Sequence, residues 1–384
     1  MKVQRKGLVI SVVTLVLMLG AFAPAWSMDN ESPVTFDIPL RWLGADLGVG
    51  YRGLALLPGV DTTFWVYAGG GYEWMNYFRD SSGALLGPGS VAPGTEDTNN
   101  TFNRWEAAWR LGVDQGFLWN ERTKTNRFEA FFFYRGVYDD NMISATIVPA
   151  LFSSGLPDRT GGLLNTLQFG LFYDDLLFNV KHKIYDGFNA EATAEWGPGF
   201  LFNTITGNAD YIRFNFNGRI FIPVYDAVPD RVSNLFSVYA GDYVSVDYSV
   251  GLNGAPVPLF IRQSFGGRDQ KTGLGHAVRG VDTAAYDTNF KAVNNLEIRA
   301  NLPALYFSNL VPGIVAYFDV GYYAQVGEGL ATVPSGFLAS TGAGVYIDVF
   351  DLGSLALYVD YRLDSPNADG TNLMTFKLEF GMHF

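Results

Sequence analysis

The chain has 384 residues, including 31 Phe, 21 Tyr, 8 Trp and 44 Gly, and these residue types favour strands and tight turns over helical bundles. Hydrophobic residues make up 48% and charged residues 17%, a composition that excludes an intrinsically disordered chain. The formal net charge of −12 argues against a nucleic-acid partner, and the absence of cysteine excludes disulfides, thiolate metal sites and cysteine nucleophiles.

The amino-terminal residues predict export. Basic residues precede an apolar stretch of 16 residues at 8–23, and the small Ala25 and Ser27 fit the last positions before a cleavage site at Met28. We therefore predict a secretory signal peptide over residues 1–27. The alternative is a retained membrane anchor, but a membrane-spanning helix needs ~20 apolar residues.

Beyond residue 27, apolar and polar residues alternate with a period of two. No later stretch reaches 18 apolar residues, which excludes a helical membrane protein. The alternating segments match the ~9 to 11 residues of tilted membrane strands better than the ~5 to 6 residues of soluble strands. Their polar face carries Arg, Asp, Glu and Asn, which suit a wet lumen but not the dry core of a soluble sandwich. The sequence therefore predicts an all-β fold, a transmembrane antiparallel β-barrel.

Turn residues divide the chain into strand-like segments. Bacterial single-chain barrels normally have an even number of strands, so one strand is missed, merged or wrongly assigned, and residues 34–40 are the first candidate for a missed one. We expect 12 to 16 strands in total. The predicted segments are 42–56, 62–78, 102–118, 125–140, 162–175, 187–202, 209–225, 233–250, 289–302, 311–325, 337–350, 353–364 and 372–384.

Connection lengths predict the orientation of the barrel, because long loops face outward and short turns face the periplasm. If the carboxyl terminus lies on the periplasmic side, the longer polar connections all fall on the outer side: 79–101, 141–161, 251–288, 326–336 and 365–371. The predicted organisation is thus a signal peptide at 1–27, a short periplasmic segment at 28–41 and an outer-membrane barrel at 42–384.

The connection 251–288 carries the most specific motifs. Phe-Gly-Gly at 265–267 is followed, after eleven residues, by Arg-Gly-Val at 279–281. The next two segments read Asn-Leu-Glu-Ile-Arg at 295–299 and Tyr-x-Asp-x-Gly at 317–321. This succession resembles the outer-membrane insertase and transporter superfamily of BamA, TamA and the two-partner secretion transporters. In that family a Gly-Gly element precedes a Val-Arg-Gly-Phe/Tyr motif at the tip of the sixth external loop.

The resemblance implies that the loop folds into the lumen and is anchored there. Arg279 would be the anchor, Asp319 its first acceptor and Glu297 a second candidate, since a guanidinium fork can satisfy a desolvated carboxylate with two hydrogen bonds. The alternative is that Arg279 is a solvated charge on an external loop. The loop-anchor motif is completed by three glycines: Gly266, Gly267 and Gly280.

The resemblance covers roughly residues 162–384 and also includes Tyr-Asp-Asp at 173–175, similar to the family's Tyr-Asp-x-Arg-Asp strand. Val281 stands where the family has an aromatic residue, and Tyr317 stands for a Phe. Only about 14 residues separate Met28 from the first clear segment. We therefore expect no periplasmic POTRA domain, which makes the chain similar to the POTRA-less branch.

The chain ends in alternating apolar residues and a final Phe, which resembles the carboxyl-terminal signal that the barrel-assembly machinery reads on the last strand. The residues of this predicted assembly signal are Phe376, Leu378, Phe380, Met382 and Phe384.

The predicted function is outer-membrane biogenesis, meaning insertion or translocation of protein or lipid, by a barrel located in the bacterial outer membrane. The expected partners are outer-membrane lipid and lipopolysaccharide, the barrel-assembly machinery and a periplasmic or POTRA-bearing protein that delivers the client. We expect no enzymatic activity, cofactor or metal. One alternative is a passive, cation-favouring porin. A weaker one is a barrel hydrolase, for which His276 lies near Ser264 and Asp269 in the chain.

Overall fold

The computed structural model describes much of the chain from residue 34 onward. The predicted signal peptide lies outside the described residues. The described residues are 34–37, 40–41, 44–52, 54, 56–76, 101–142, 158, 161–179, 183–203, 209–226, 236–269, 271–281, 286, 288–305, 310–327, 335–349, 353–364 and 374–380.

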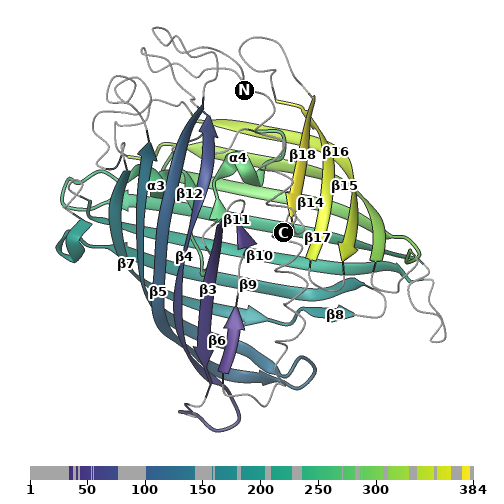
Figure 1. Cartoon of the computed structure of the whole chain (residues 1–384), viewed down its shortest axis with the longest axis horizontal. Coiled ribbons are helices and arrows are strands. Elements are labelled where there is room, and N and C mark those ends of the chain that lie inside the picture. Colours follow the sequence, from purple (N-terminus) through teal and green to yellow (C-terminus); the bar gives the residue numbers. More distant parts are fainter. Residues whose placement is uncertain are drawn as a thin grey trace, which may run out of the picture.

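Long antiparallel strands form one continuous sheet that curves into a barrel (Figure 1). The main strands of this sheet follow one another in chain order, which is the arrangement expected of an up-and-down barrel. In sheet order the strands are β1 (Val34–Asp37), β3 (Gly44–Tyr51), β4 (Thr62–Asn76), β5 (Thr101–Asn120), β6 (Thr125–Met142), β7 (Gly161–Asp174), β9 (Ile184–Gly197), β10 (Tyr211–Asp226), β11 (Ser237–Gly251), β14 (Phe290–Asn301), β15 (Leu310–Ala324), β16 (Gly336–Val349), β17 (Gly353–Arg362) and β18 (Met374–Phe380).

Two short strands lie beside this path. β2 (Leu40–Arg41) pairs with β3, and β8 (Leu177–Asn179) pairs with β9. β1 and β2 keep one register against β3, in which Val34 lies opposite Tyr51 and Arg41 opposite Gly44. Together with β3 they form a hairpin, which is the first part of the sheet. The strand suggested at 34–40 is therefore present, and the barrel sheet starts before residue 42, where the sequence placed its beginning.

The segment predicted as a strand over 187–202 ends earlier than expected. β9 stops at Gly197, and a kinked turn, η2 (Gly199–Asn203), follows it, in which Leu201 and Phe202 have non-helical backbone angles. Pro198 separates the two elements, and its missing amide hydrogen removes a donor from the strand ladder. After Pro198 the alternation also ends, because Phe200, Leu201 and Phe202 are consecutive apolar residues.

Side chains alternate between an apolar outer face and a polar inner face. On β14, Leu296 and Ile298 are 46% and 55% exposed, whereas Glu297 between them is fully buried. On β10, Phe214 is 50% exposed, whereas its neighbour Arg213 is 1% exposed. This distribution confirms the predicted all-β barrel, and an apolar outside with a polar inside is typical of membrane barrels.

Within the described part of the chain, no helix combines the length and apolarity that a membrane crossing requires.

Candidate functional site

The connection between β11 and β14 folds into the interior of the barrel. We call residues 252–289 the lumen loop. It contains two single-turn helices and a two-stranded hairpin: α3 (Leu259–Arg262), β12 (Ser264–Phe265), β13 (Lys271–Thr272) and α4 (Leu274–Ala277). Apolar loop residues such as Leu259, Phe265 and Val278 are almost fully buried. The predicted folding of this loop into the lumen is therefore present in the structure.

The lumen loop contacts opposite walls of the barrel. It forms hydrogen bonds with β5 through Arg110 and with β15 through Asp319. In the fourteen-strand order of the sheet, β5 and β15 are seven places apart, so they face each other across the interior. The loop therefore spans the lumen rather than lining one side of it.

Arg279 holds one end of this span. Its Nε and Nη2 donate to the two carboxylate oxygens of Asp319 at 2.8 and 2.7 Å, and its backbone amide donates to Oδ2 of the same residue at 3.0 Å. Its Nη1 donates to Oε1 of Glu297 at 2.5 Å. All three side chains are fully buried. The geometry is the two-pronged guanidinium–carboxylate pair expected of an anchor.

The strand register brings the two acceptors of Arg279 together. Tyr317 on β15 lies directly opposite Glu297 on β14, and Asp319 follows Tyr317 on the same inner face. The Arg279 guanidinium carbon lies 3.4 Å from the centre of the Tyr317 ring, which permits a cation–π contact. The other oxygen of Glu297 accepts from Arg299 Nε at 2.5 Å, so two arginines and two carboxylates balance one another.

The chain turns at Gly280, directly after the anchor residue Arg279. The φ of Gly280, +80°, lies in the left-handed region, where side chains are rarely found. A Cβ at this position would also lie 3.1 Å from Cβ of Asp360 on β17. The glycine following Arg279 therefore allows the loop to approach the wall closely.

A second anchor, at Arg268, was not predicted from the sequence. Its Nη2 hydrogen-bonds to Glu129 on β6, and its backbone amide donates to Oε1 of Glu191 on β9 at 2.6 Å. Its guanidinium carbon lies 4.4 Å from the ring centre of Phe131 and 4.7 Å from that of Phe172. The signal in the sequence was an Arg directly after the Gly-Gly pair.

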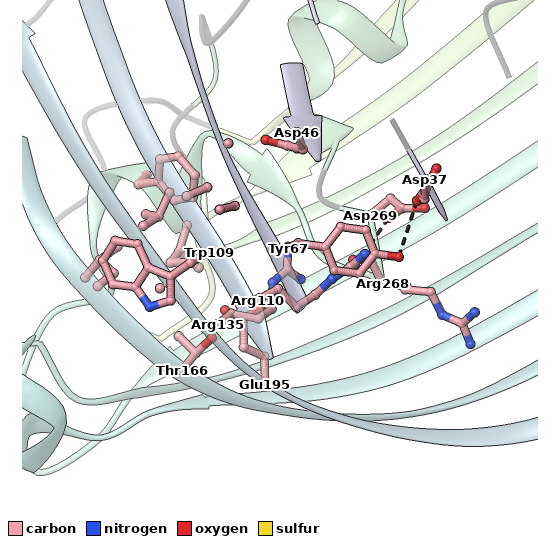
Figure 2. Close-up of a pocket in the computed structure, with 18 of the residues that line it drawn as sticks. Asp37, Asp46, Tyr67, Trp109, Arg110, Arg135, Thr166, Glu195, Arg268 and Asp269 are labelled. Carbon is pink, nitrogen blue, oxygen red and sulfur yellow. Dashed lines mark hydrogen bonds and ion pairs between the residues drawn. The ribbon is translucent and has the colours of Figure 1, made fainter. Parts of the chain in front are cut away.

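Arg110 of β5 extends this second anchor towards the first hairpin. Its Nη1 donates to the backbone oxygen of Arg268 at 2.5 Å and lies 3.4 Å from Oδ1 of Asp269. Its guanidinium carbon lies 3.8 Å from the ring centre of Tyr67 on β4. Figure 2 shows Tyr67 reaching Asp37 of β1, whose carboxylate accepts a 3.3 Å hydrogen bond from the Tyr67 hydroxyl. These contacts connect the loop to the edge strand.

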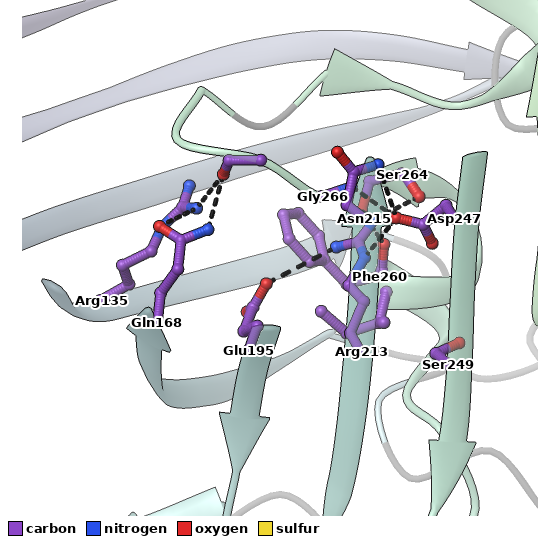
Figure 3. Close-up of polar contacts among 12 residues, drawn as sticks. Arg135, Gln168, Glu195, Arg213, Asn215, Asp247, Ser249, Phe260, Ser264 and Gly266 are labelled. Atoms are coloured by element: carbon purple, nitrogen blue, oxygen red, sulfur yellow. Dashed lines mark hydrogen bonds and ion pairs between the residues drawn. The ribbon is translucent and has the colours of Figure 1, made fainter. Parts of the chain in front are cut away.

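The predicted glycines Gly266 and Gly267 directly precede the second anchor, Arg268. The amide of Gly266 donates to Asp247 Oδ2 at 2.7 Å, and the oxygen of Gly267 accepts from Arg135 Nη1 at 2.8 Å and Gln168 Nε2 at 2.7 Å (Figure 3). Asp247 is held in turn by Arg213 Nε at 2.9 Å. The glycine pair thus binds β6, β7 and β11 and does not contribute to the Arg279 cluster.

Gly267 supports a test of how tightly the loop is held. Its φ is +119°, and a Cβ there would lie 2.9 Å from Glu191 Oε1. We expect Gly267→Ala to destabilise the barrel by about 1–3 kcal/mol more than backbone strain alone would, because the added Cβ would crowd the Glu191 carboxylate. The measurement is the temperature at which the folded, fast-migrating form on electrophoresis is lost. Gly254→Ala is the control, because Gly254 also has positive φ (+76°) but nothing lies within 4 Å of its Cβ position. Equal shifts for both variants would contradict tight docking.

One residue of the connection before β7 also reaches the loop. Asp158 Oδ1 and Oδ2 accept from the amides of Leu259 and Phe260 at 2.5 and 2.9 Å, at the start of α3. Burial raises the pKa of the Asp158 carboxyl above its usual range, and these two amide hydrogen bonds counteract part of the shift.

The predicted assembly signal is described only in part. Phe376 and Leu378 on β18 are 73% and 50% exposed on the outer face, and β18 ends at Phe380. Met382 and Phe384 lie outside the described residues. A role of these side chains in assembly stays a prediction.

The side chain of His276, on which the hydrolase alternative depends, lies outside the described residues. Among the side chains that are described, no group of three or more His, Asp or Glu is arranged to hold a metal ion.

Comparison with known proteins assigns no family. No protein-family profile matches the chain, and no curated protein matches it. Among solved structures, the chain is similar to BamA from Haemophilus ducreyi lacking POTRA domains 1–3, with a TM-score of 0.40 and 12% sequence identity. The match covers 91% of this chain and 74% of that one. A likeness of this size does not bear on function.

Proposed function

We propose that this chain is an integral outer-membrane β-barrel that takes part in outer-membrane biogenesis, by inserting or translocating polypeptides or lipids without catalysing a reaction. The observation that carries the proposal is the lumen loop held by Arg279 between Asp319 and Glu297. The motif resemblance of residues 265–321 adds support. In this proposal the barrel acts mechanically, by opening its wall.

The two ends of the sheet are where such an opening would occur. Within the described residues, the strand order begins at β1 and finishes at β18, and no pairing joins them. Strand edges carry unpaired amide and carbonyl groups that can template an added strand. β18 has only seven residues, and β3 next to the edge contains Gly44, Gly48 and Gly50. Short, glycine-rich strands weaken the wall at this position.

The location and partners belong to the same proposal. The exposed apolar outer face suits a lipid bilayer, and the proposed membrane is the bacterial outer membrane with its lipopolysaccharide. The barrel-assembly machinery would insert the chain, and a periplasmic or POTRA-bearing protein would deliver the client. Mild crosslinking in cells followed by purification of the barrel tests this: recovery of a periplasmic protein supports delivery, and recovery of lipid alone contradicts it.

A passive porin is the second candidate, because the inner face is polar and leaves a cavity of about 440 Å³. The loop contacts across the lumen favour a closed pathway instead. We predict that the purified barrel in planar bilayers shows little steady conductance. Deletion of residues 255–286 should raise the conductance at least about tenfold, because removing a plug opens a polar channel. Large, steady conductance of the unmodified barrel would favour the porin.

The absence of catalysis also remains part of the proposal. Phospholipid hydrolysis by the purified barrel that is lost in His276→Ala would contradict it and support the hydrolase.

A further inference from the structure

The interior holds a cavity between the first hairpin, the wall from β4 to β10 and the lumen loop (Figure 2). Its volume of about 440 Å³ lies within the ~300–1,000 Å³ of typical small-molecule sites. The hydrogen bonds and ion pairs that hold the lumen loop do not fill this space. We call this space the hairpin cavity.

One transverse row of inward residues forms much of its wall. In the strand register, Tyr67 lies opposite Arg110, Arg110 opposite Arg135 and Arg135 opposite Thr166. Each residue comes from a different strand, so the row is built by the barrel and not by any local motif. Further along, Tyr211 of β10 lies opposite Gly197 of β9, and a Cβ on this glycine would fall 2.3 Å from the Tyr211 ring. The glycine therefore makes room for the ring.

Most charges around the cavity are already matched by protein groups. Asp37 accepts from the hydroxyl of Tyr67, Arg110 pairs with Asp269, and Arg268 pairs with Glu129. A strongly charged ligand would therefore have to displace an existing partner.

Several buried polar atoms of the lining are different. The hydroxyls of Thr166 and Tyr211 and Oε2 of Glu195 have no hydrogen-bond partner among the described residues, and neither has Nε of Arg268. Thr166, Tyr211 and Glu195 are 4%, 0% and 2% exposed, and the Glu195 oxygen forms an ion pair with Arg213 Nη1 at 3.9 Å, which is beyond hydrogen-bond distance. An unpaired buried polar group costs about 1–3 kcal/mol, so such groups normally bind water or a ligand.

Another part of the lining is apolar, and its residues belong to the buried cluster that also includes Tyr211: Val137, Leu164, Phe260 and Ile261. A fitting ligand therefore combines apolar surface with groups that exchange hydrogen bonds with two hydroxyls and donate to a carboxylate. Sugar rings have this character, because their hydroxyls both donate and accept while their C–H faces are apolar.

We propose that the hairpin cavity binds a neutral sugar. Thr166, Tyr211 and Glu195 would be its polar contacts, and the apolar lining residues Val137, Leu164, Phe260 and Ile261 would contact its C–H surface. The site is independent of the biogenesis role proposed above, since it requires neither a client nor an opening wall.

Titration calorimetry of the detergent-purified barrel tests the proposal, with glucose and maltose as neutral probes and glucuronate and glucosamine as anionic and cationic ones. We expect the neutral sugars to bind, and Tyr211→Phe, Thr166→Val and Glu195→Gln each to weaken binding about tenfold, the usual effect of losing one buried hydrogen bond. Ser340→Ala is the matched control: it removes a buried hydroxyl that also has no partner among the described residues but lies outside the cavity, and it should leave binding unchanged.

Retained heat-modifiable migration shows that each variant is folded. Tyr211→Phe keeps the ring over Gly197 and decides the case if the other variants misfold. The proposal is overturned if neither neutral sugar binds, which would leave a cavity holding water only. It is also overturned if Tyr211→Phe binds as tightly as the parent chain, or if glucuronate or glucosamine binds more tightly than glucose.

Discussion

Arg279→Ala is expected to release the lumen loop and to destabilise the barrel by about 3–5 kcal/mol, the range measured when one member of a buried ion pair is removed. Asp319 would lose all its hydrogen bonds from the guanidinium, and Glu297 would lose the one from Arg279 Nη1 while it keeps the one from Arg299 Nε. Two carboxylates would then share one cation in a fully buried cluster. The measurement is protease cleavage within residues 252–289 in native membranes, combined with the temperature at which heat-modifiable migration is lost.

Two variants separate anchoring from a general loss of charge. Arg279→Lys keeps the charge but lacks the planar fork, so it should give an intermediate loss of stability. Arg122→Ala removes an exposed arginine from the turn between β5 and β6 and should change neither readout. An unchanged protease pattern and melting temperature in Arg279→Ala would mean that the loop is held by Arg268 and its neighbours alone.

The strands were predictable from the sequence because their signal is local. The polarity of Glu297 between Leu296 and Ile298 predicts which face of the strand its side chain occupies, and the period of two repeats this information along the whole strand. The short first hairpin was harder to predict. Residues 34–41 do alternate, but Pro39 between β1 and β2 cannot donate a ladder hydrogen bond, which weakened the prediction of a strand.

The candidate site was only partly predictable. Arg279, Asp319 and Glu297 were found through a motif resemblance, not through any rule that links positions 40 residues apart. Arg268 and the row from Tyr67 to Thr166 had no such signal. Their contacts depend on the registers of many strands and on the path of the lumen loop, whose short helices have no periodicity. A register is fixed by the complete barrel, so it cannot be read from one segment.

A covalent link between β1 and β18 is the second change for which we expect a large effect. If the wall must open there, a covalent link between the two strands should abolish the biogenesis function and leave the fold intact. The chain has no cysteine, so any disulfide in a double-cysteine variant is the introduced one. Thr35 on β1 and Thr375 on β18 are partly buried residues at the two ends of the sheet, and a disulfide needs Cα atoms within ~7 Å. A short crosslinker that is thiol-reactive at both ends, such as a bis-methanethiosulfonate, covers a wider gap and forms disulfides that can be reduced.

A matched link distinguishes loss of opening from the presence of a crosslink. Tyr361 on β17 and Met374 on β18 are paired in the sheet and are 41% and 54% exposed on the outer face. A disulfide between cysteines at these two positions joins strands that are already hydrogen-bonded, so it should leave function unchanged.

The central claim, that this barrel works by opening its wall, is tested most directly by measuring outer-membrane protein and lipid content in cells that depend on the Thr35→Cys/Thr375→Cys variant. The account predicts that both fall when the edge is crosslinked, recover when a cleavable link is reduced, and stay normal with the Tyr361→Cys/Met374→Cys control. Normal outer-membrane content in cells whose barrels are fully crosslinked between β1 and β18 would contradict it.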